Sequence, residues 1–412
     1  MRVALFNSRK PRHASPADRW VRLTLLAARQ LARGGRTLVT GLGPLHYDLP
    51  LFVALETPGR AIVFLDAAPD TPRAEMLRRR YPEALGCTSV TIVHPDAERA
   101  AGEERDRAIG ETADLAIVVE ARRGGVMERI GFDLLRRHRP VLAFPPDEGP
   151  DTAGNGRLLD AGADELTAAD LDLDPATLAA ALAPGARPLV PPRLPSPFPP
   201  ARRAGDWPYV MHYTRACPAE LPGETRWAYV RSLVESRDPG FHRGSRVLRR
   251  ILAGSCIQAS GRLIRGGHAV VSFTAAHPAD VAALARWARH LGRWTFEPYG
   301  MGVRRELAPR LGLRPVVYGP PGLYRALPEA ERYLFQVADT AGIDWTAERE
   351  WRARGDVDLH RWPAADGIVV VPSEEEACTV RRASRFRVVS LAEAGESGDV
   401  GTASALGWHG QA

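Results

Sequence analysis

Small and basic residues follow three strongly apolar segments in the first half of the chain. These loops read Asn7-Ser8-Arg9-Lys10, Thr40-Gly41-Leu42-Gly43 and Arg122-Arg123-Gly124-Gly125. Glycine lets a backbone approach a phosphate group closely, and hydroxyl and guanidinium groups donate hydrogen bonds to its oxygens. The residue types therefore indicate a site for a phosphate-bearing ligand, with the candidate residues Ser8, Arg9, Thr40, Gly41, Gly43, Gly124 and Gly125.

Each loop taken alone has a simpler interpretation, because a glycine after a strand also makes an ordinary turn. Three such loops at one edge of a sheet favour the ligand site instead. The chain contains neither GxGxxG nor GxxxxGK followed by Ser or Thr. The sequence therefore supports neither the dinucleotide-binding fingerprint nor a P-loop.

The elements that must position these loops alternate between strands and helices. Residues 17–33 have the apolar spacing of a helix and end at a glycine pair. Apolar runs typical of buried strands occupy residues 2–6, 36–41, 61–66, 88–94, 114–121 and 140–146. This alternation predicts an α/β fold, a Rossmann-like parallel sheet with helices on both faces. The carboxyl ends of parallel strands meet at one edge, so we expect the three loops to converge there.

The length of 412 residues suits two domains. Residues 183–206 are crowded with proline, which excludes a helix or a central strand and indicates a linker. We expect the Rossmann-like domain over residues 1–182. An α+β domain is expected over residues 207–395, because helical and strand-like segments follow each other there in mixed order. Residues 396–412 have the composition of a disordered tail.

Composition narrows the class of protein. Hydrophobic residues make up 45% of the chain and charged residues 25%, as in ordinary globular proteins. No apolar run reaches the length of a membrane helix, so we expect a cytoplasmic protein without a membrane partner. The four cysteines form no CxxC pair and the histidines lack ligand spacing, so we expect neither disulfides nor a metal site. The net charge of +6 is compatible with anionic ligands.

The order of several segments over residues 2–167 resembles one protein family. The segments are NSRKP, ARQLARGG, TLVTGLG, AIVFL, ERDRAIGETADLAIVVEARRGG, RPVLAFP and GNGRLLDAGADEL. The most specific of them are AIVVEARRGG and GNGRLLDAGADEL. The family is DNA-processing protein A (DprA or Smf), which belongs to a wider group of Rossmann-like folds that includes the lysine-decarboxylase-like cytokinin-activating enzymes.

This resemblance implies roles for residues that match the family's loops. Ser8 and Arg9 match its glycine-serine-arginine loop, and Gly41 matches its serine-glycine loop. Gly124 and Gly125 stand where the family has a second serine-glycine step. All five are thereby implied to contact the ligand.

A further pair of candidates, Arg105 and Arg107, stands where the family has arginine-asparagine-arginine. Because acidic residues surround them, the two arginines also fit a solvated, charged helix end. Asp106 replaces the family's asparagine, and a carboxylate there would repel a phosphate backbone. A second departure is Leu45-His46-Tyr47 in place of glycine-isoleucine-aspartate, with Asp48 displaced by one position.

The resemblance also implies the kind of ligand. The family binds single-stranded DNA and a recombinase partner, whereas members of the wider group bind nucleotides or nucleotide-derived signals. Single strands favour a basic groove with stacking aromatic residues, and this half of the chain has few aromatic residues. The altered loops therefore suit a nucleotide better than single-stranded DNA.

The second half contains a looser constellation of polar residues, namely His212-Tyr213-Thr214, Ser272-Phe273-Thr274 and Glu348-Arg349-Glu350-Trp351-Arg352. Its order resembles uncharacterised phage-defence domains and ADP-ribosyltransferases, in which a histidine or arginine holds NAD and a late glutamate orients a ribose hydroxyl. This likeness implies His212, Glu348 and Glu350 as catalytic residues, with a carboxylate stabilising the oxocarbenium-like centre that departing nicotinamide leaves. Scattered histidine, serine and glutamate residues are also ordinary structural residues of an α+β domain.

Two hypotheses of different class follow. In the first, a DprA-like domain linked to DNA processing binds a nucleotide or nucleic acid as a ligand sensor. In the second, the C-terminal domain is an NAD-consuming effector controlled by that sensor. A nucleoside-monophosphate hydrolase would need an acidic pair such as Glu120 and Glu128, but the usual proline-glycine-glycine loop is absent. The sequence leaves open the enzymatic activity, the choice between NAD and another nucleotide, and whether the chain forms a homo-oligomer.

Overall fold

The computed structural model describes residues 1–8, 14–57, 59–94, 102–183, 198, 207–217, 219–221, 223–236, 242–288, 293–340 and 343–392. The chain divides into two compact units. Unit 1 comprises Met1–Val190 and Glu224–Phe241, and unit 2 comprises Pro191–Gly223 and His242–Ala412. The predicted tail and most of the predicted linker lie outside the described residues.

Unit 1 is built around a parallel sheet of seven strands in the order β4-β3-β2-β1-β5-β6-β7. The strands are β1 (Arg2–Asn7), β2 (Thr37–Gly41), β3 (Arg60–Phe64), β4 (Val90–Val93), β5 (Leu115–Glu120), β6 (Val141–Ala143) and β7 (Asp164–Glu165). The predicted Rossmann-like sheet is confirmed. The sequence pattern missed β7, because its two residues are exposed and carry no apolar signal.

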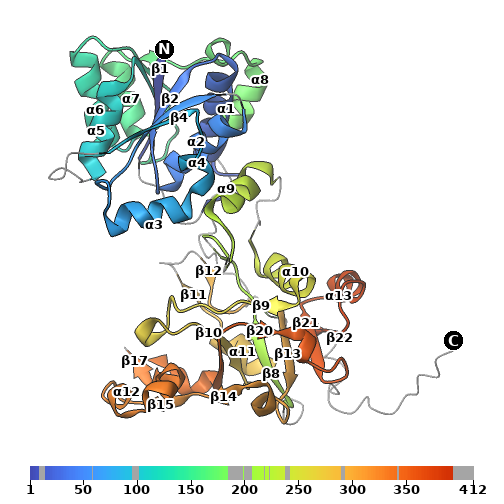
Figure 1. The fold of residues 1–412 in the computed structure, drawn as a ribbon. Helices are drawn as coiled ribbons and strands as arrows, with labels where there is room; N and C mark the ends of the chain where they lie inside the picture. Colours follow the sequence, from blue (N-terminus) through green and yellow to red (C-terminus); the bar gives the residue numbers. More distant parts are fainter. Residues whose placement is uncertain are drawn as a thin grey trace. The chain divides into compact units, whose positions relative to one another are not determined.

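Helices cover both faces of this sheet. They are α1 (Arg19–Arg33), α2 (Leu45–Glu56), α3 (Pro72–Arg80), α4 (Pro82–Leu85), α5 (Gly102–Thr112), α6 (Val126–Arg136), α7 (Ala153–Asp160), α8 (Pro175–Leu182) and α9 (Arg226–Glu235). In Figure 1, α5, α6 and α7 lie on one face, and α1, α2 and α8 lie on the other. Side chains of β1 alternate between the two cores: Leu5 packs with Leu23 of α1, and Phe6 packs with Ile130 of α6.

Helix α9 belongs to unit 1, although its sequence lies inside the range that we expected for the second domain. Its buried residues Trp227, Val230 and Leu233 join the same core as α1 and α2, and the ring centroids of Trp227 and Phe52 are 5.0 Å apart. The spacing of apolar residues over 227–235 predicts a helix here. It could not indicate which core the apolar face would cover.

Unit 2 contains a mixed sheet in the order β14-β19-β10-β8-β13-β21-β22, in which the pair β21–β22 is parallel and the other pairs are antiparallel. Its strands are β8 (Tyr209–Tyr213), β10 (Val270–Thr274), β13 (Gly300–Arg304), β14 (Leu313–Pro315), β19 (Glu350–Arg354), β21 (Gly367–Val371) and β22 (Arg387–Ser390). The expected α+β architecture is confirmed. The apolar run 268–274 predicts a strand that begins two residues before β10. The run 315–319 predicts β15 (Val317–Gly319) together with only the last residue of β14.

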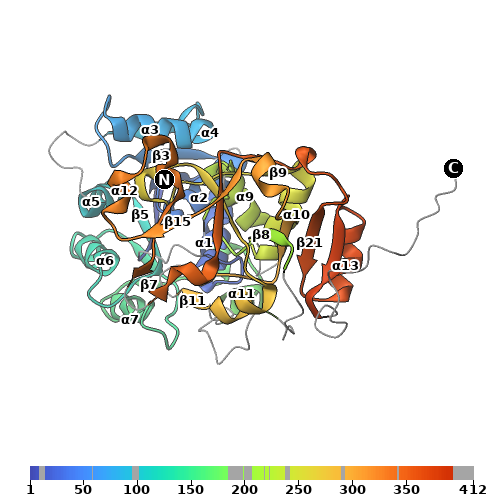
Figure 2. The ribbon, with the colours of Figure 1, turned by 90° about the horizontal axis from the view of Figure 1, so that it is seen from below.

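Shorter elements complete unit 2. Four two-stranded sheets are formed by β9 (Cys256–Ile257) with β20 (Val357–Asp358), β11 (Trp287–Ala288) with β12 (Arg293–Trp294), β15 (Val317–Gly319) with β16 (Phe335–Val337), and β17 (Asp339–Thr340) with β18 (Ile343–Asp344). The helices are α10 (Gly244–Gly254), α11 (Pro278–Leu284), α12 (Leu323–Ala326) and α13 (Glu374–Arg381). Figure 2 shows α13 beside β21, toward the β22 edge of the mixed sheet.

Within the described residues, no helix has both the length and the hydropathy that crossing a membrane requires. The same part of the chain contains no group of three or more His, Cys, Asp or Glu side chains that could hold a metal ion.

The two glycines of α7 provide a test of how this helix packs on β5. A Cβ atom at Gly154 would lie 2.7 Å from the Ala121 carbonyl oxygen, which is backbone and cannot rotate away. A Cβ atom at Gly156 would meet Pro146 at an ordinary 3.6 Å. We expect Gly154→Ala to lower the free energy of unfolding by about 1–3 kcal/mol through overpacking.

Gly156→Ala is the matched control, because it places the same methyl group in the same helix. Alanine favours helix over glycine by up to about 1 kcal/mol, so this variant should be neutral or stabilising. Urea denaturation of the two variants measures the difference. Equal midpoints for both would show that α7 does not approach β5 as described.

Candidate functional site

Buried polar residues of unit 1 gather at one edge of its sheet. Helices that follow parallel strands begin at the carboxyl ends of those strands, so α1, α2, α6 and α7 all present their first turns there. The strand ends and early helical turns supply buried Asn7, Ser8, Arg19, Thr40, His46, Asp48, Asp106, Glu120, Glu128, Thr152 and Asn155. We call this edge, with these residues, the polar rim.

At the centre of the polar rim the strand order reverses between β1 and β5, the point where open α/β sheets leave a crevice. The Ser8 amide donates to the Glu120 carbonyl oxygen at 2.7 Å, and Ser8 Oγ accepts from the Arg122 amide at 2.9 Å. Asn7 is fully buried, and its Nδ2 donates to Thr24 Oγ1 at 3.0 Å. Among the described residues, none provides a hydrogen-bond partner for its Oδ1. The β1–β5 junction therefore contains a buried acceptor that the described part of the chain leaves unsatisfied.

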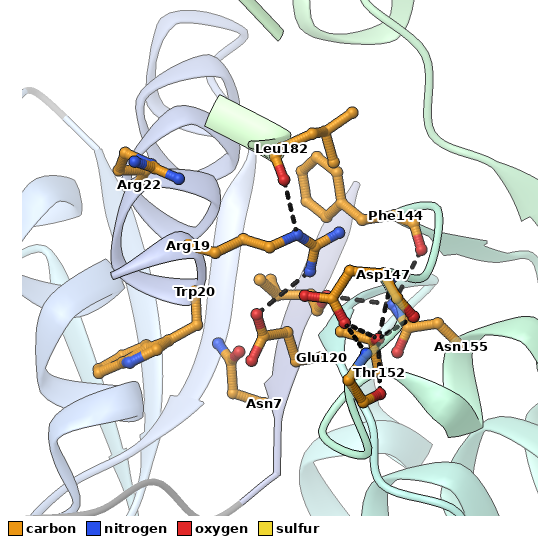
Figure 3. A network of polar contacts seen from close by, with 12 residues as sticks. Asn7, Arg19, Trp20, Arg22, Glu120, Phe144, Asp147, Thr152, Asn155 and Leu182 are labelled. Atoms are coloured by element: carbon orange, nitrogen blue, oxygen red, sulfur yellow. Dashed lines mark hydrogen bonds and ion pairs between the residues drawn. The ribbon is translucent and has the colours of Figure 1, made fainter. Parts of the chain in front are cut away.

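A buried ion pair lies beside this acceptor. Arg19 Nη1 donates to Glu120 Oε1 at 3.1 Å, and both side chains are about 5% exposed (Figure 3). The same guanidinium donates to the carbonyl oxygens of Pro145 and Leu182, at 2.6 and 3.2 Å. Glu120 is thus paired with an arginine, one of the roles open to a carboxylate at a strand end.

Asn155 joins two strand ends at the rim. Its Oδ1 accepts from the Ala121 amide at 2.7 Å, and its Nδ2 donates to the carbonyl oxygens of Val119 and Phe144, at 3.1 and 2.9 Å. Figure 3 shows it next to Thr152, from the same helix start. Asn155 belongs to the segment GNGRLLDAGADEL of the family resemblance, but the sequence alone predicts no role for this side chain. Its amide holds the loop after β5 in place.

The two predicted loops that contain glycine lie at the polar rim. Amide groups in both loops already donate hydrogen bonds to carboxylates of the chain itself. The Gly43 amide donates to Asp48 Oδ1 at 2.9 Å, and the Gly124 amide donates to Glu128 Oε2 at 2.6 Å. The Gly125 amide donates to the Arg122 carbonyl oxygen at 2.9 Å. These carboxylates hold positions that an anionic ligand would take at a helix N-terminus.

Asp48 is the most buried carboxylate of this set, and the sequence alone predicts no role for it. Its Oδ2 accepts from Arg226 Nε at 2.7 Å and from Tyr81 Oη at 2.9 Å, and its side chain is 0% exposed. Burial, followed by the Asp48 charge, raises the pKa of Tyr81 well above its ordinary value. Arg226 comes from α9, nearly two hundred residues away in sequence, so no local pattern could have identified the pair.

The two predicted arginines of α5 have different surroundings. Arg105 is largely buried: it donates to Asp106 Oδ1 at 3.0 Å, and its Cζ lies 4.9 Å from the centroid of the Tyr47 ring. A Cβ atom at Gly41 would lie 3.2 Å from Arg105 Nε, so the two predicted site residues are in contact. Desolvation raises the pKa of Asp106.

Arg107 is half-exposed on the outer surface of α5, where it pairs with Glu103 and lies 3.9 Å from Asp133 of α6. The structure thus separates Arg107 from Arg105. Thr40, also predicted, is buried at the end of β2 and donates to the Tyr47 carbonyl oxygen at 3.4 Å. Arg9 lies outside the described residues.

In unit 2, strand register places His212 and Glu350 on opposite faces of the mixed sheet. Glu350 pairs with Thr274, which pairs with Met211, so these side chains share a face and His212 takes the other. The His212 ring packs 5.7 Å from the Phe273 ring. Burial lowers the pKa of His212 to about 4, so the imidazole is neutral at pH 7.

Glu350 is held by an arginine of its own strand. Arg352 donates to the two carboxylate oxygens at 2.8 and 2.9 Å. The same guanidinium, 2% exposed, donates to the carbonyl oxygens of Tyr333 and Phe335. This fully bonded pair stabilises the packing of β19. The predicted catalytic set is therefore divided, with His212 away from Glu350.

Glu348 has different surroundings from Glu350. It closes a short 3-10 turn (Trp345–Glu348), and its carbonyl oxygen accepts from Thr274 Oγ1. Burial and the nearby Glu350 charge raise the pKa of Glu348 to about 7, against a smaller opposite effect of Arg215. This carboxyl group can therefore exchange a proton near neutral pH, the property required of a general acid or base.

The buried ion pair of Asp48 and Arg226 supports a stability prediction. Asp48→Asn leaves a buried guanidinium opposite a neutral amide, and we expect it to lower the free energy of unfolding by about 3–5 kcal/mol. The exposed pair Glu56–Arg231, at 2.8 Å, joins the same two helices and provides the control. Glu56→Gln should cost less than about 1 kcal/mol. Similar losses in chemical denaturation would contradict the assigned burial.

The raised pKa of Glu348 predicts a pH dependence. The folded chain holds a proton on this carboxyl group at pH values, between about 4.5 and 7, where the unfolded chain releases it. Stability therefore decreases as the pH rises through this range. Glu348→Gln removes this titration. The free energy of unfolding of the variant minus that of the wild type should therefore be higher at pH 8 than at pH 5, by on the order of 2 kcal/mol. Urea midpoints at the two pH values measure this, and a pH-independent difference would contradict it.

Comparison with known proteins adds similarities over part of the chain. No protein-family model matches the chain. No curated protein matches it in sequence. Over 40% of its length the chain is similar to DNA processing protein A from Streptococcus pneumoniae, with 18% identity, a TM-score of 0.33 and 58% of that chain covered. It is similar over the same share to DNA processing protein A from Helicobacter pylori, studied for its single-stranded DNA binding mode, with 18% identity, a TM-score of 0.32 and 74% of that chain covered.

Proposed function

We propose that unit 1 binds a nucleotide at the polar rim, between the loops that follow β1 and β5. The strand order supports this position, because the connections on the two sides of the β1–β5 junction run in opposite directions and their helices cover opposite faces. Ligands of open α/β sheets collect at such a point, outside the carboxyl ends of the strands.

The observation that carries the proposal is the unsatisfied Oδ1 of Asn7. A buried acceptor without a partner costs about 1–3 kcal/mol, and such atoms are commonly completed by a ligand or water. Ribose hydroxyl and base amino groups are donors for such an acceptor, and because Asn7 is 0% exposed, the proposal requires the groups that cover it to move aside on binding. The neighbouring loop supplies an exposed guanidinium, Arg123, which has no ion pair with any described residue. A nucleotide has both a donor for Asn7 and a phosphate for Arg123.

Aromatic burial favours a single nucleotide over a strand. Binding of single strands relies on aromatic side chains on which successive bases stack. Around the rim, Phe6, Tyr47, Tyr81 and Phe144 are all completely buried, so their ring faces are covered by the protein. Single-stranded DNA is therefore the comparison ligand in the test.

Calorimetric titration of the full chain with AMP, GMP, ADP, ATP, NAD and a mixed-sequence 20-nucleotide strand tests the proposal. We expect one of the mononucleotides or NAD to bind and Arg123→Glu to weaken that binding roughly tenfold, about 1.4 kcal/mol. Arg107→Glu is the control, with the same charge change at a half-exposed residue of α5 that is not one of the rim residues. It should leave affinity unchanged.

Asn7→Ala tests the acceptor itself and should weaken the same ligand without lowering the melting temperature of the free protein by more than a few degrees. Absence of binding for the whole panel would overturn the proposal. Equal losses in Arg107→Glu and Arg123→Glu would assign the effect to net charge instead. Tight binding of the strand alone would identify a nucleic-acid site.

A further inference from the structure

All charged residues of helix α10 in unit 2 are arginines, and they lie on its exposed face. Its sequence, GSRVLRRILAG, contains no acidic residue. The apolar residues Leu248, Ile251 and Leu252 are buried in the core of unit 2. The arginines at the start and along the helix are all exposed, namely Arg243, Arg246, Arg249 and Arg250. At 3.6 residues per turn, these four side chains occupy an arc of about 120° opposite the buried stripe. We call them the α10 basic face.

Some exposed arginines of the chain pair with a carboxylate, as in Arg79–Glu75, Arg107–Glu103, Arg136–Asp133, Arg137–Glu111 and Arg314–Glu331. Others, such as Arg29, Arg33 and Arg36 at the end of α1, form no ion pair with a described residue. Among the described residues, none forms an ion pair with Arg246 or Arg249. Their charge is therefore not neutralised by the described part of the chain.

The carboxylates nearest the start of α10 are engaged in other contacts. Glu297 accepts from the amides of Ala216 and Gly244, at 2.5 and 3.0 Å. Glu376, of α13, accepts from Tyr299 Oη at 2.8 Å. These bonds engage both carboxylates with groups other than Arg246 and Arg249, so the guanidinium groups of Arg246 and Arg249 are available to an external anion.

We propose that the α10 basic face binds the phosphate backbone of a nucleic acid. Guanidinium groups bind phosphate oxygens through two parallel hydrogen bonds. From residue 243 to residue 250 the helix rises about 10 Å, which matches about three nucleotide steps of one strand along a duplex axis. The apolar side of α10 is buried, so the helix has no apolar face to insert into a membrane.

Such a contact is independent of the nucleotide site proposed for unit 1. It uses side chains of another unit, and it recognises the backbone without reading bases. A polyanion with regularly spaced phosphates satisfies several of these arginines at once, whereas a free nucleotide satisfies one or two. Affinity should therefore increase with strand length and decrease with salt.

Fluorescence anisotropy of the full chain with a labelled 20-nucleotide strand, and with the duplex of the same sequence, tests the proposal between 50 and 200 mM KCl. We expect Arg246→Glu/Arg249→Glu to weaken binding at least tenfold and to reduce the slope of log K against log salt by about 2. Arg136→Glu/Arg137→Glu makes the same change in net charge at exposed, paired arginines. It should change affinity less than threefold.

Each alternative gives a different result. Equal losses in the two double variants would overturn the proposal in favour of a net-charge effect. Poly-glutamate that competes as well as DNA at equal charge would overturn it in favour of an acidic protein partner. If Arg123→Glu abolishes strand binding and Arg246→Glu/Arg249→Glu does not, the strand binds at the polar rim and the α10 proposal fails. Arg246→Glu/Arg249→Glu should leave nucleotide binding unchanged, which distinguishes failure of the α10 proposal from failure of the nucleotide site proposed for unit 1.

Discussion

Neutralisation of buried charge at the polar rim is the constraint on which the structure of unit 1 depends. Helices that begin there bring the positive ends of their dipoles to the same edge. Asp48 and Glu128 stand in the first turns of α2 and α6 and accept from the loop amides, so the chain supplies its own anions. At the β1–β5 junction this internal pairing is incomplete, because no described residue provides a partner for Asn7 Oδ1. The same edge thus has satisfied amides at two loops and a buried, unsatisfied acceptor at a third.

The need to pair Asp48 also explains why unit 1 is not one continuous segment. Its partner Arg226 lies on α9, which the chain reaches only after forming β8 of unit 2. A fragment ending in the proline-rich segment would leave Asp48 buried without its guanidinium and would expose the apolar residues that Trp227 and Leu233 cover. Composition placed a boundary at residues 183–206, yet the core of unit 1 extends past it. Ligand experiments therefore need the full chain.

Local patterns predicted the parts of the fold that depend on local physics. Apolar runs bounded by glycine or polar residues gave the six longer strands of unit 1. Five of these strands lie inside the sheet with helices on both faces, whereas the edge strand β4 is apolar in sequence but has two of its four residues exposed. Strand register and pairing between residues far apart in the sequence could not be predicted from local patterns. Arg105 and Arg107 look alike in sequence, but a rotation of about 200° along α5 buries one beside Tyr47 and leaves the other in solvent. Likewise, one residue of register separates His212 from the face that holds Glu350.

The role of each arginine in this chain depends on the groups that surround it more than on how many arginines the chain has. Arg19 and Arg352 are buried and bonded to a carboxylate and to carbonyl oxygens, so they act as structural bridges within one unit each. Paired surface arginines contribute little to stability and present little net field. The positive surface potential that goes with the net charge of +6 must therefore come from arginines that have no carboxylate partner. Among the described residues, Arg246 and Arg249 of α10 are two such arginines. A field concentrated on one helix attracts polyanions more strongly than the same charge spread over the molecule.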